Sequence, residues 1–228
     1  MAGRYRRLVV LGIAAVALAI GVFIVYGGSR EPNLIEKLSA GDFDQKVEAI
    51  QGLEESDSDA AGRAIARASQ DKDTRVARRA ICALGRMKRP DLLDHIKTAT
   101  RAKDESVRVA AITALGTAGD ERDVSMLTEN LSNTAETTRV RAASALSLGA
   151  LDDFRAVPTL IEALSDPSPL VRGRAYAAIR KIYQLDVGFR AKDEPAKRQA
   201  AITRIQQLYP SLKERHADYM RRKKAREP

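Results

Sequence analysis

The sequence of 228 residues contains no tryptophan, one cysteine and two histidines, and aromatic residues make up 4% of it. A single cysteine, Cys82, excludes an internal disulfide; we expect a small helix residue there, the alternative being a reactive or intermolecular thiol. His95 and His216 lie in different parts of the chain, so no Cys/His cluster is available for zinc. The motifs GxGxxG, GxxxxGK[ST] and GxSxG are also absent. We therefore expect no enzyme activity, no catalytic residues, no metal and no cofactor.

What the sequence does contain is an internal repeat of about 31 residues. One apolar series consists of Leu53, Leu84, Leu115, Leu146 and Ile179. A second series, about twenty residues ahead, consists of Leu34, Ile65, Ile96, Leu127 and Leu160. The intervals in both series are 31, 31, 31 and 33 residues. Two series that keep one period predict stacked hairpins of a first helix, A, and a second helix, B. A single hairpin cannot bury its apolar face alone, whereas stacked neighbours can.

Four segments carry a resemblance to a known repeat family. They are DTRVARRAICALG (73–85), DESVRVAAITALG (104–116), TTRVRAASALSLG (137–149) and PLVRGRAYAAI (169–179). The pattern resembles the bacterial HEAT-like repeat, of the short kind also called PBS-lyase-type. The resemblance covers residues 33–182 and implies an all-α fold, a right-handed α-solenoid of about five helical hairpins. Such arrays mostly provide protein-interaction surfaces, and a few relatives act on phycobilin chromophores. Tetratricopeptide and ankyrin repeats fit worse, because their tryptophan and Thr-Pro-Leu-His signatures are missing.

Glycines and aspartates predict where the B helices begin and end. Left-handed C-caps, which favour glycine, are expected at Gly85, Gly116 and Gly149. N-caps, which need a short acceptor side chain, are expected at Asp73, Asp104 and Asp166.

The resemblance also implies a ladder of arginines, each bonded to an aspartate of the turn between helices A and B. The structural residues that it assigns are Arg108, Arg139, Arg172, Asp104 and Asp166. Asp104 is expected to serve Arg108, and Asp166 to serve Arg172. Ala77 stands in the arginine position of the second hairpin, so we expect the ladder to be incomplete.

The N-terminal segment Leu8–Tyr26 contains no charged residue. Nineteen helical residues span about 28 Å, close to the ~30 Å of a bilayer core. Because arginines precede this segment, the positive-inside rule predicts a cytoplasmic N-terminus (1–7), a single-pass transmembrane helix (8–26), a linker (27–32) and an extracytoplasmic, periplasmic repeat domain. The alternative is a cleaved signal peptide that releases a secreted, soluble binding protein, although the small-x-small cleavage pattern is poor.

The two segments after the repeats differ in composition. Residues 183–210 contain an amphipathic stretch from about Pro195 to Tyr209, and we expect a helical cap over the last hairpin. Residues 211–228 are basic, with seven Lys or Arg and three Asp or Glu. We expect a solvated tail there, the alternative being attraction to anionic lipid or to an acidic partner.

The net charge of +9 is concentrated at the two ends of the chain. Residues 8–210 carry 29 basic and 27 acidic groups, so the predicted array is nearly neutral. A nucleic-acid-binding array would show a basic stripe along successive units. We therefore do not expect nucleic acid as a partner.

We expect protein partners, of unknown identity, to bind a concave surface formed by the B helices. The candidate binding residues are Arg75, Arg79, Arg86, Arg141, Arg174 and Lys181. One period before the first three stand Asp44, Glu48 and Glu55, so an acidic B helix is expected beside a basic one. These residues either pair and fix the stacking order, or form a bipolar binding patch.

The function predicted from the sequence is a membrane-anchored, non-enzymatic protein–protein interaction scaffold. The second hypothesis is an accessory or assembly factor for an enzyme or cofactor system, one that holds a chromophore or redox protein.

Overall fold

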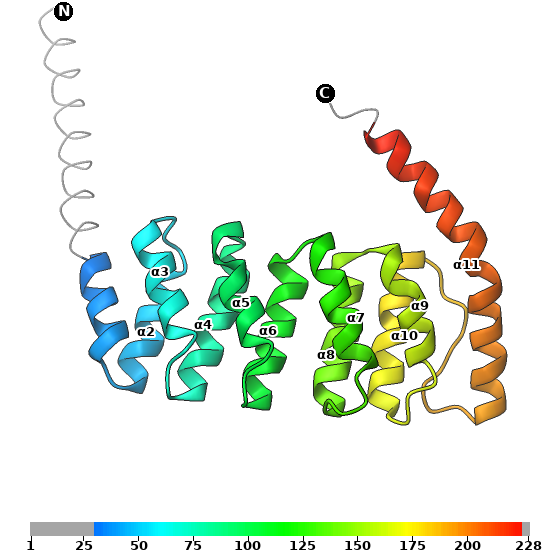
Figure 1. The fold of residues 1–228 in the computed structure, drawn as a ribbon, viewed down its shortest axis with the longest axis horizontal. Coiled ribbons are helices and arrows are strands. Elements are labelled where there is room, and N and C mark those ends of the chain that lie inside the picture. Colours follow the sequence, from blue (N-terminus) through cyan, green and yellow to red (C-terminus); the bar gives the residue numbers. More distant parts are fainter. Residues whose placement is uncertain (1–29, 225–228) are drawn as a thin grey trace, which may run out of the picture.

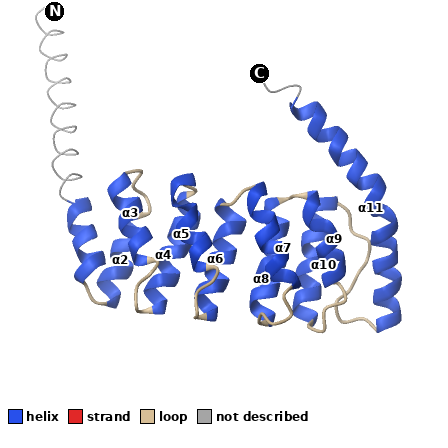
Figure 2. Cartoon of the chain, in the orientation of Figure 1, coloured by secondary structure: helices blue, strands red, loops and turns tan. Residues whose placement is uncertain are grey.

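The computed structural model describes residues 30–224, and the regular elements in this range are helices (Figure 2). Helical residues 30–40 and α2 (Phe43–Leu53) form the first hairpin. The A helices of the next four hairpins are α3 (Asp59–Ala68), α5 (Leu93–Ala99), α7 (Val124–Ser132) and α9 (Val157–Ala163). Their B helices are α4 (Thr74–Met87), α6 (Glu105–Ala118), α8 (Thr138–Leu151) and α10 (Pro169–Tyr183). Short 3₁₀ turns precede α5, α7 and α9 at Pro90–Leu92, Glu121–Asp123 and Phe154–Ala156.

The hairpins stand side by side in chain order, and α11 (Pro195–Lys224) closes the C-terminal end of the row (Figure 1). Each B helix packs against the B helices of neighbouring hairpins and against the A helix of its own hairpin. Leu53, Leu84, Leu115 and Ile179 are each at most 1% exposed and belong to one continuous core. The predicted all-α array of stacked hairpins is thus confirmed.

The predicted register is wrong in the fourth hairpin. Leu146 is 43% exposed, whereas Leu148 is fully buried and takes the equivalent place in the core. The cause is a longer A helix, because α7 has nine residues where α5 and α9 have seven. The 33-residue interval therefore falls between Leu115 and Leu148.

The glycines predicted as C-caps lie inside the B helices instead, two residues before the last helical residue. A Cβ atom at Gly116 would lie 2.7 Å from the Ser147 hydroxyl oxygen, and one at Gly149 would lie 2.7 Å from the Cα atom of Ala178. Gly85 faces α6 in the same way. These glycines let neighbouring B helices approach closely. The left-handed C-caps are the non-glycine residues Lys88, Asp152 and Gln184.

The boundary predicted at residue 210 is not a helix end, since α11 continues through Pro210 to Lys224. Proline removes one backbone hydrogen bond, and Figure 1 shows α11 bending part-way along its length. Beyond the proline, Leu212 is buried and the His216 ring stacks on Phe154 with centroids 4.3 Å apart. Packing against the last hairpin therefore includes the first part of the predicted tail.

The predicted single-pass membrane localisation is contradicted by the helices that the structure describes. None of the helices within residues 30–224 is long and apolar enough to cross a membrane. The segment on which the prediction rested, Leu8–Tyr26, lies outside the described residues, as does the basic N-terminus at 1–7.

Candidate partner-binding surface

One face of the B-helix row is formed by the second, sixth, ninth and thirteenth residues of each B helix, and we call it the B-helix face. All of these side chains are exposed or half-buried. From α4 to α10 they are Arg75, Arg79, Cys82, Arg86, Ser106, Ala110, Thr113, Thr117, Arg139, Ala143, Leu146, Ala150, Leu170, Arg174, Ala177 and Lys181. Equivalent residues of neighbouring helices lie roughly 10 Å apart, the usual separation of packed helices.

The chemistry of the B-helix face changes along the array. The equivalent positions of the first hairpin are acidic at Asp44, Glu48 and Glu55, and those of α4 are arginines. The positions of α6 and α8 carry one charged residue between them, Arg139, and the face becomes basic again at α10. Two large apolar side chains on it are exposed to solvent, Leu146 at 43% and Leu170 at 46%. From α4 to α10 the face thus has basic ends around a mainly uncharged middle, and the first hairpin adds acidic residues before α4.

Five of the six predicted binding residues lie on this face: Arg75, Arg79, Arg86, Arg174 and Lys181. The sixth, Arg141, does not. It is the fourth residue of α8 and only 7% exposed. Arg139, predicted to be structural, lies on the face instead, with its Nε atom 3.8 Å from Glu105. The two arginines exchange positions because the fourth hairpin is shifted by two residues.

The predicted pairs between the acidic and basic B helices are not present among the described residues. Arg86 pairs with Glu54 rather than Glu55. The Glu48 carboxylate lies 3.4 Å from the Lys37 Nζ atom instead. Arg79 has no ion pair within residues 30–224.

Arg75 bonds Asp73 at 2.6 Å and lies 4.0 Å over the Phe43 ring. The Arg75 guanidinium, together with the Arg75 backbone N–H, holds the pKa of Asp73 at about 2. Arg75 is thus oriented by a residue of its own hairpin and by Phe43 of the first hairpin, while its side chain stays exposed.

The fourth residue of each B helix forms the arginine ladder, and we call the contacts of one such residue a rung. Each rung reaches the next turn along the array: Lys46 contacts Asp71 at 2.6 Å, Arg108 contacts Glu136 at 3.2 Å and Arg141 contacts Asp166 at 3.0 Å. Arg172 donates to the Ala191 carbonyl at 2.6 Å, in the segment before α11. The rungs therefore join neighbouring hairpins, and Ala77 leaves one rung missing.

The partners predicted for this ladder need correction. Asp104 does not pair with Arg108; its carboxylate accepts hydrogen bonds from the N–H groups of Ser106 and Val107 and caps α6. The carboxylate of Asp166 accepts a hydrogen bond from Arg141 of the preceding hairpin. Arg172 donates to the backbone carbonyl of Asp166 instead, at 2.7 Å. The N-cap of α10 is Ser168.

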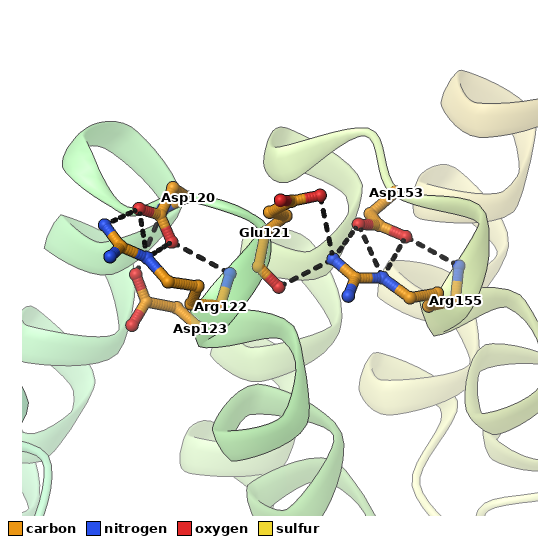
Figure 3. Close-up of polar contacts among 6 residues, drawn as sticks. All are labelled: Asp120, Glu121, Arg122, Asp123, Asp153 and Arg155. Carbon is orange, nitrogen blue, oxygen red and sulfur yellow. Dashed lines mark hydrogen bonds and ion pairs between the residues drawn. The ribbon is translucent and has the colours of Figure 1, made fainter. Parts of the chain in front are cut away.

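The opposite edge of the array carries a second set of charged contacts, in the turns between hairpins (Figure 3). Arg122 bonds Asp120, and Arg155 bonds Asp153 two residues before it. Arg155 also donates to the Glu121 carbonyl at 2.8 Å, which joins two successive turns. The Arg122 guanidinium lowers the pKa of Asp120. Sequence reasoning missed these contacts, although their signal, Asp-x-Arg, occurs in both turns.

Within the described range, no group of three or more His, Cys, Asp or Glu side chains is placed to hold a metal ion. The features that the side chains do build are two charged edges and the B-helix face between them.

Comparisons with known proteins agree with this architecture. The family model for HEAT repeats matches residues 62–148 and 133–222, which together span more than half of the chain. The complex of CpcE and CpcF of phycocyanin lyase from Nostoc sp. PCC7120 is similar, with 21% identity and a TM-score of 0.58 over 68% of this chain and 65% of that chain. An engineered protein is similar with 17% identity and a TM-score of 0.53, over 80% of this chain and 97% of that one. Among curated proteins, none matches the sequence.

At these identities the two solved structures show a shared fold. The present chain also covers less than two thirds of the phycocyanin lyase chain. The family match rests on the repeats themselves and spans the hairpins from α3 onward. The chain belongs to the HEAT-repeat family.

Proposed function

We propose that this array is a non-enzymatic scaffold that binds a protein partner across its B-helix face. The observation that supports the proposal is the exposure of Leu146 and Leu170 on the B-helix face. From α4 to α10 the charged residues of this face are mostly arginines. Protein interfaces combine a buried apolar centre with a polar rim and are enriched in arginine. Stacked hairpins supply the extended surface that such an interface needs.

The distribution of charge indicates what the partner looks like. Arg75, Arg79 and Arg86 lie at one end of the face, and Arg174 and Lys181 lie at the other. A matching partner carries an apolar segment flanked by acidic residues. Burial of the exposed part of each leucine contributes about 1 kcal/mol, whereas each exposed ion pair contributes about 0–1 kcal/mol and mainly accelerates association.

The proposal is tested by capture from a native extract on the immobilised full-length protein. The variant Leu146→Glu/Leu170→Glu places two charges at the apolar centre and should lose the captured partner. Leu185→Glu is the matched control, because Leu185 is 42% exposed but lies after α10 and outside the B-helix face. Equal capture by wild type and by the double variant, with helicity preserved in both, would sink the proposal.

The accessory role predicted from the sequence is a more specific form of this function. The fold similarity to a phycocyanin lyase complex is its support. It predicts that the captured partner carries a chromophore or redox group, and the visible absorption spectrum of the eluted complex tests that. A colourless partner without such a group leaves the scaffold function and removes the accessory role.

A further inference from the structure

The missing rung of the ladder lies between the second and third hairpins. The fourth residue of α4 is Ala77, where the other B helices carry Lys46, Arg108, Arg141 and Arg172. The facing position in the next turn is also alanine, Ala102, whereas the equivalent residues Asp71 and Asp166 supply carboxylates to other rungs. This junction therefore lacks both the cation and the acid that join the hairpins elsewhere.

The filled rungs show how a guanidinium is held at this position. The Nη1 atom of Arg108 donates to two successive turn carbonyls, Ala102 and Lys103, each at 2.9 Å. The Nη1 atom of Arg172 donates in the same way to the carbonyls of Asp166 and Pro167, at 2.7 and 2.9 Å. The pair of carbonyls is thus a recurring acceptor site of the turn between helices A and B.

In the second hairpin the equivalent carbonyls belong to Asp71 and Lys72. Among residues 30–224, no hydrogen bond is donated to either oxygen. A carbonyl oxygen accepts hydrogen bonds and cannot donate one, so this pair of acceptors selects a cation or another donor over an anion.

A surface pocket of about 620 Å³ occupies the place of the missing rung, with Ala77, Ala99, Ala102 and Val107 among its lining residues. The equivalent pockets measure about 200 Å³ between the first and second hairpins and about 240 Å³ between the fourth and fifth. Arg141 lines the pocket between the fourth and fifth hairpins, at the position that corresponds to Ala77 in the large pocket. The large pocket exists where the chain supplies no side chain for the rung.

The charged groups around this pocket are of both signs. Asp71 and Asp104 line it, and hydrogen bonding lowers the pKa of Asp104, chiefly from the Ser106 hydroxyl, so its carboxylate is ionised at neutral pH. Arg101 and Lys103 are exposed in its wall. Their positive charges repel a bound cation. We therefore expect a low affinity for an isolated arginine side chain and a higher affinity for a larger ligand that makes further contacts nearby.

We propose that this pocket accepts an arginine side chain of a partner protein, whose guanidinium completes the ladder between the second and third hairpins. Three of the four filled rungs use arginine. Its Nη1 atom donates to the carbonyls of its own turn while Nη2 reaches the next segment of the array, as in Arg108 and Arg172, and the single nitrogen of an ammonium does not offer two such separate donors. The biological occupant rests on the partner-binding function proposed above. The chemical preference of the pocket does not, because it can be measured without the partner.

The test titrates N-acetyl-arginine amide into the isotope-labelled full-length protein and follows backbone amide shifts by NMR. The amides of Ala77, Ala102 and Val107 should shift saturably. N-acetyl-citrulline amide, which is nearly isosteric but neutral, should produce no saturable shift. Equal shifts from both probes, or shifts that do not saturate, would overturn the proposal.

Two variants and a control identify the site. Ala77→Arg fills the pocket with a guanidinium of the chain itself and should lower the affinity for the arginine probe at least tenfold. Cys82→Arg adds the same charge to α4 on the B-helix face and should change the affinity less than twofold. Ala102→Asp restores the acid of the rung and should tighten binding about tenfold, as expected for a charge-assisted hydrogen bond.

The variants also separate this proposal from the general one. If Ala77→Arg does not fold, Ala102→Asp still decides the matter, since unchanged affinity in that variant counts against the pocket. Loss of capture in Leu146→Glu/Leu170→Glu with intact probe binding would show that the two sites are independent. Probe binding that Ala77→Arg leaves unchanged in a folded protein would refute the pocket and leave the B-helix face untouched.

Discussion

Arg141 and Asp166 join the fourth hairpin to the fifth through two guanidinium–carboxylate contacts, at 3.0 and 3.3 Å. Their side chains are 8% and 11% exposed. Arg141 also donates to the Glu136 carbonyl of its own turn at 2.6 Å. Because both charges are largely removed from water, this rung fixes how the two hairpins sit against each other.

Removal of Arg141 should therefore cost more than removal of its exposed neighbour. Arg141→Met leaves the Asp166 carboxylate buried without its partner, and we expect a loss of about 3 kcal/mol in the free energy of unfolding. Arg139→Met is the control, because Arg139 is exposed and pairs only loosely with Glu105; it should cost less than about 1 kcal/mol. Urea denaturation measures both. Equal losses would contradict the role of the rung.

The glycines inside the B helices give a prediction with opposite signs at two sites. Gly116→Ala places a Cβ atom 2.7–2.9 Å from atoms of Ser147, and we expect overpacking to destabilise the protein by about 1–3 kcal/mol. Gly173→Ala, also within a B helix, meets no atom closer than 3.8 Å. It should stabilise by about 0.5–1 kcal/mol through helix propensity. Thermal unfolding of the two variants checks this, and stabilisation in both would refute the close approach of α6 and α8.

The corrected register of the fourth hairpin predicts which leucine is structural. Leu148→Ala should cost about 2–5 kcal/mol, because Leu148 is fully buried. Leu146→Ala removes an exposed side chain and should change stability by less than about 0.5 kcal/mol. Chemical denaturation of the two variants compares them directly. A larger loss at Leu146 would restore the register expected from the sequence.

Much of this architecture follows from periodicity alone. Leu53, Leu84 and Leu115 are buried as the 31-residue period predicts, because each occupies the same position of a stacked B helix. The basic residues Arg75, Arg79 and Arg86 share the B-helix face, since their spacing follows the helical turn. Periodic burial is a strong signal, and it is repeated in every hairpin.

The errors arose where two signals competed. In the fourth hairpin, Thr-Arg-Val-Arg contains two arginines two residues apart, and the period favoured Arg139. The pair Val140-Arg141 matches Val107-Arg108 and Val171-Arg172, and that local match was the better guide. The two extra residues of α7, about half a helical turn, shift the register and were not anticipated from the period. Inter-hairpin rungs could not be read from sequence, because the partner acid lies in the following turn rather than beside the arginine.

The acidic residue that caps α4 gives a prediction for pH. Asp73 titrates near a pKa of about 2, lowered by the Arg75 guanidinium and the Arg75 backbone N–H. Since the folded pKa is depressed, its stabilising contribution is complete above the ordinary value of 3.8 and is lost as the pH falls through about 2. The carboxyl carbon of Asp73, followed by NMR, should show this midpoint. Arg75→Gln should raise it, and Arg79→Gln, on the same helix without contact to Asp73, should leave it unchanged.

The central claim, that a partner protein lies on the B-helix face, is tested most directly through Cys82. This residue is exposed on α4, within the B-helix face, and is the single cysteine of the chain. A photoreactive maleimide attached there should cross-link the captured partner upon illumination. The same label on Ser125→Cys in a Cys82→Ser background, exposed on the A helix α7, should yield little or no cross-link. Cross-linking from Ser125→Cys with none from Cys82 would place the partner on the A helices and contradict the account.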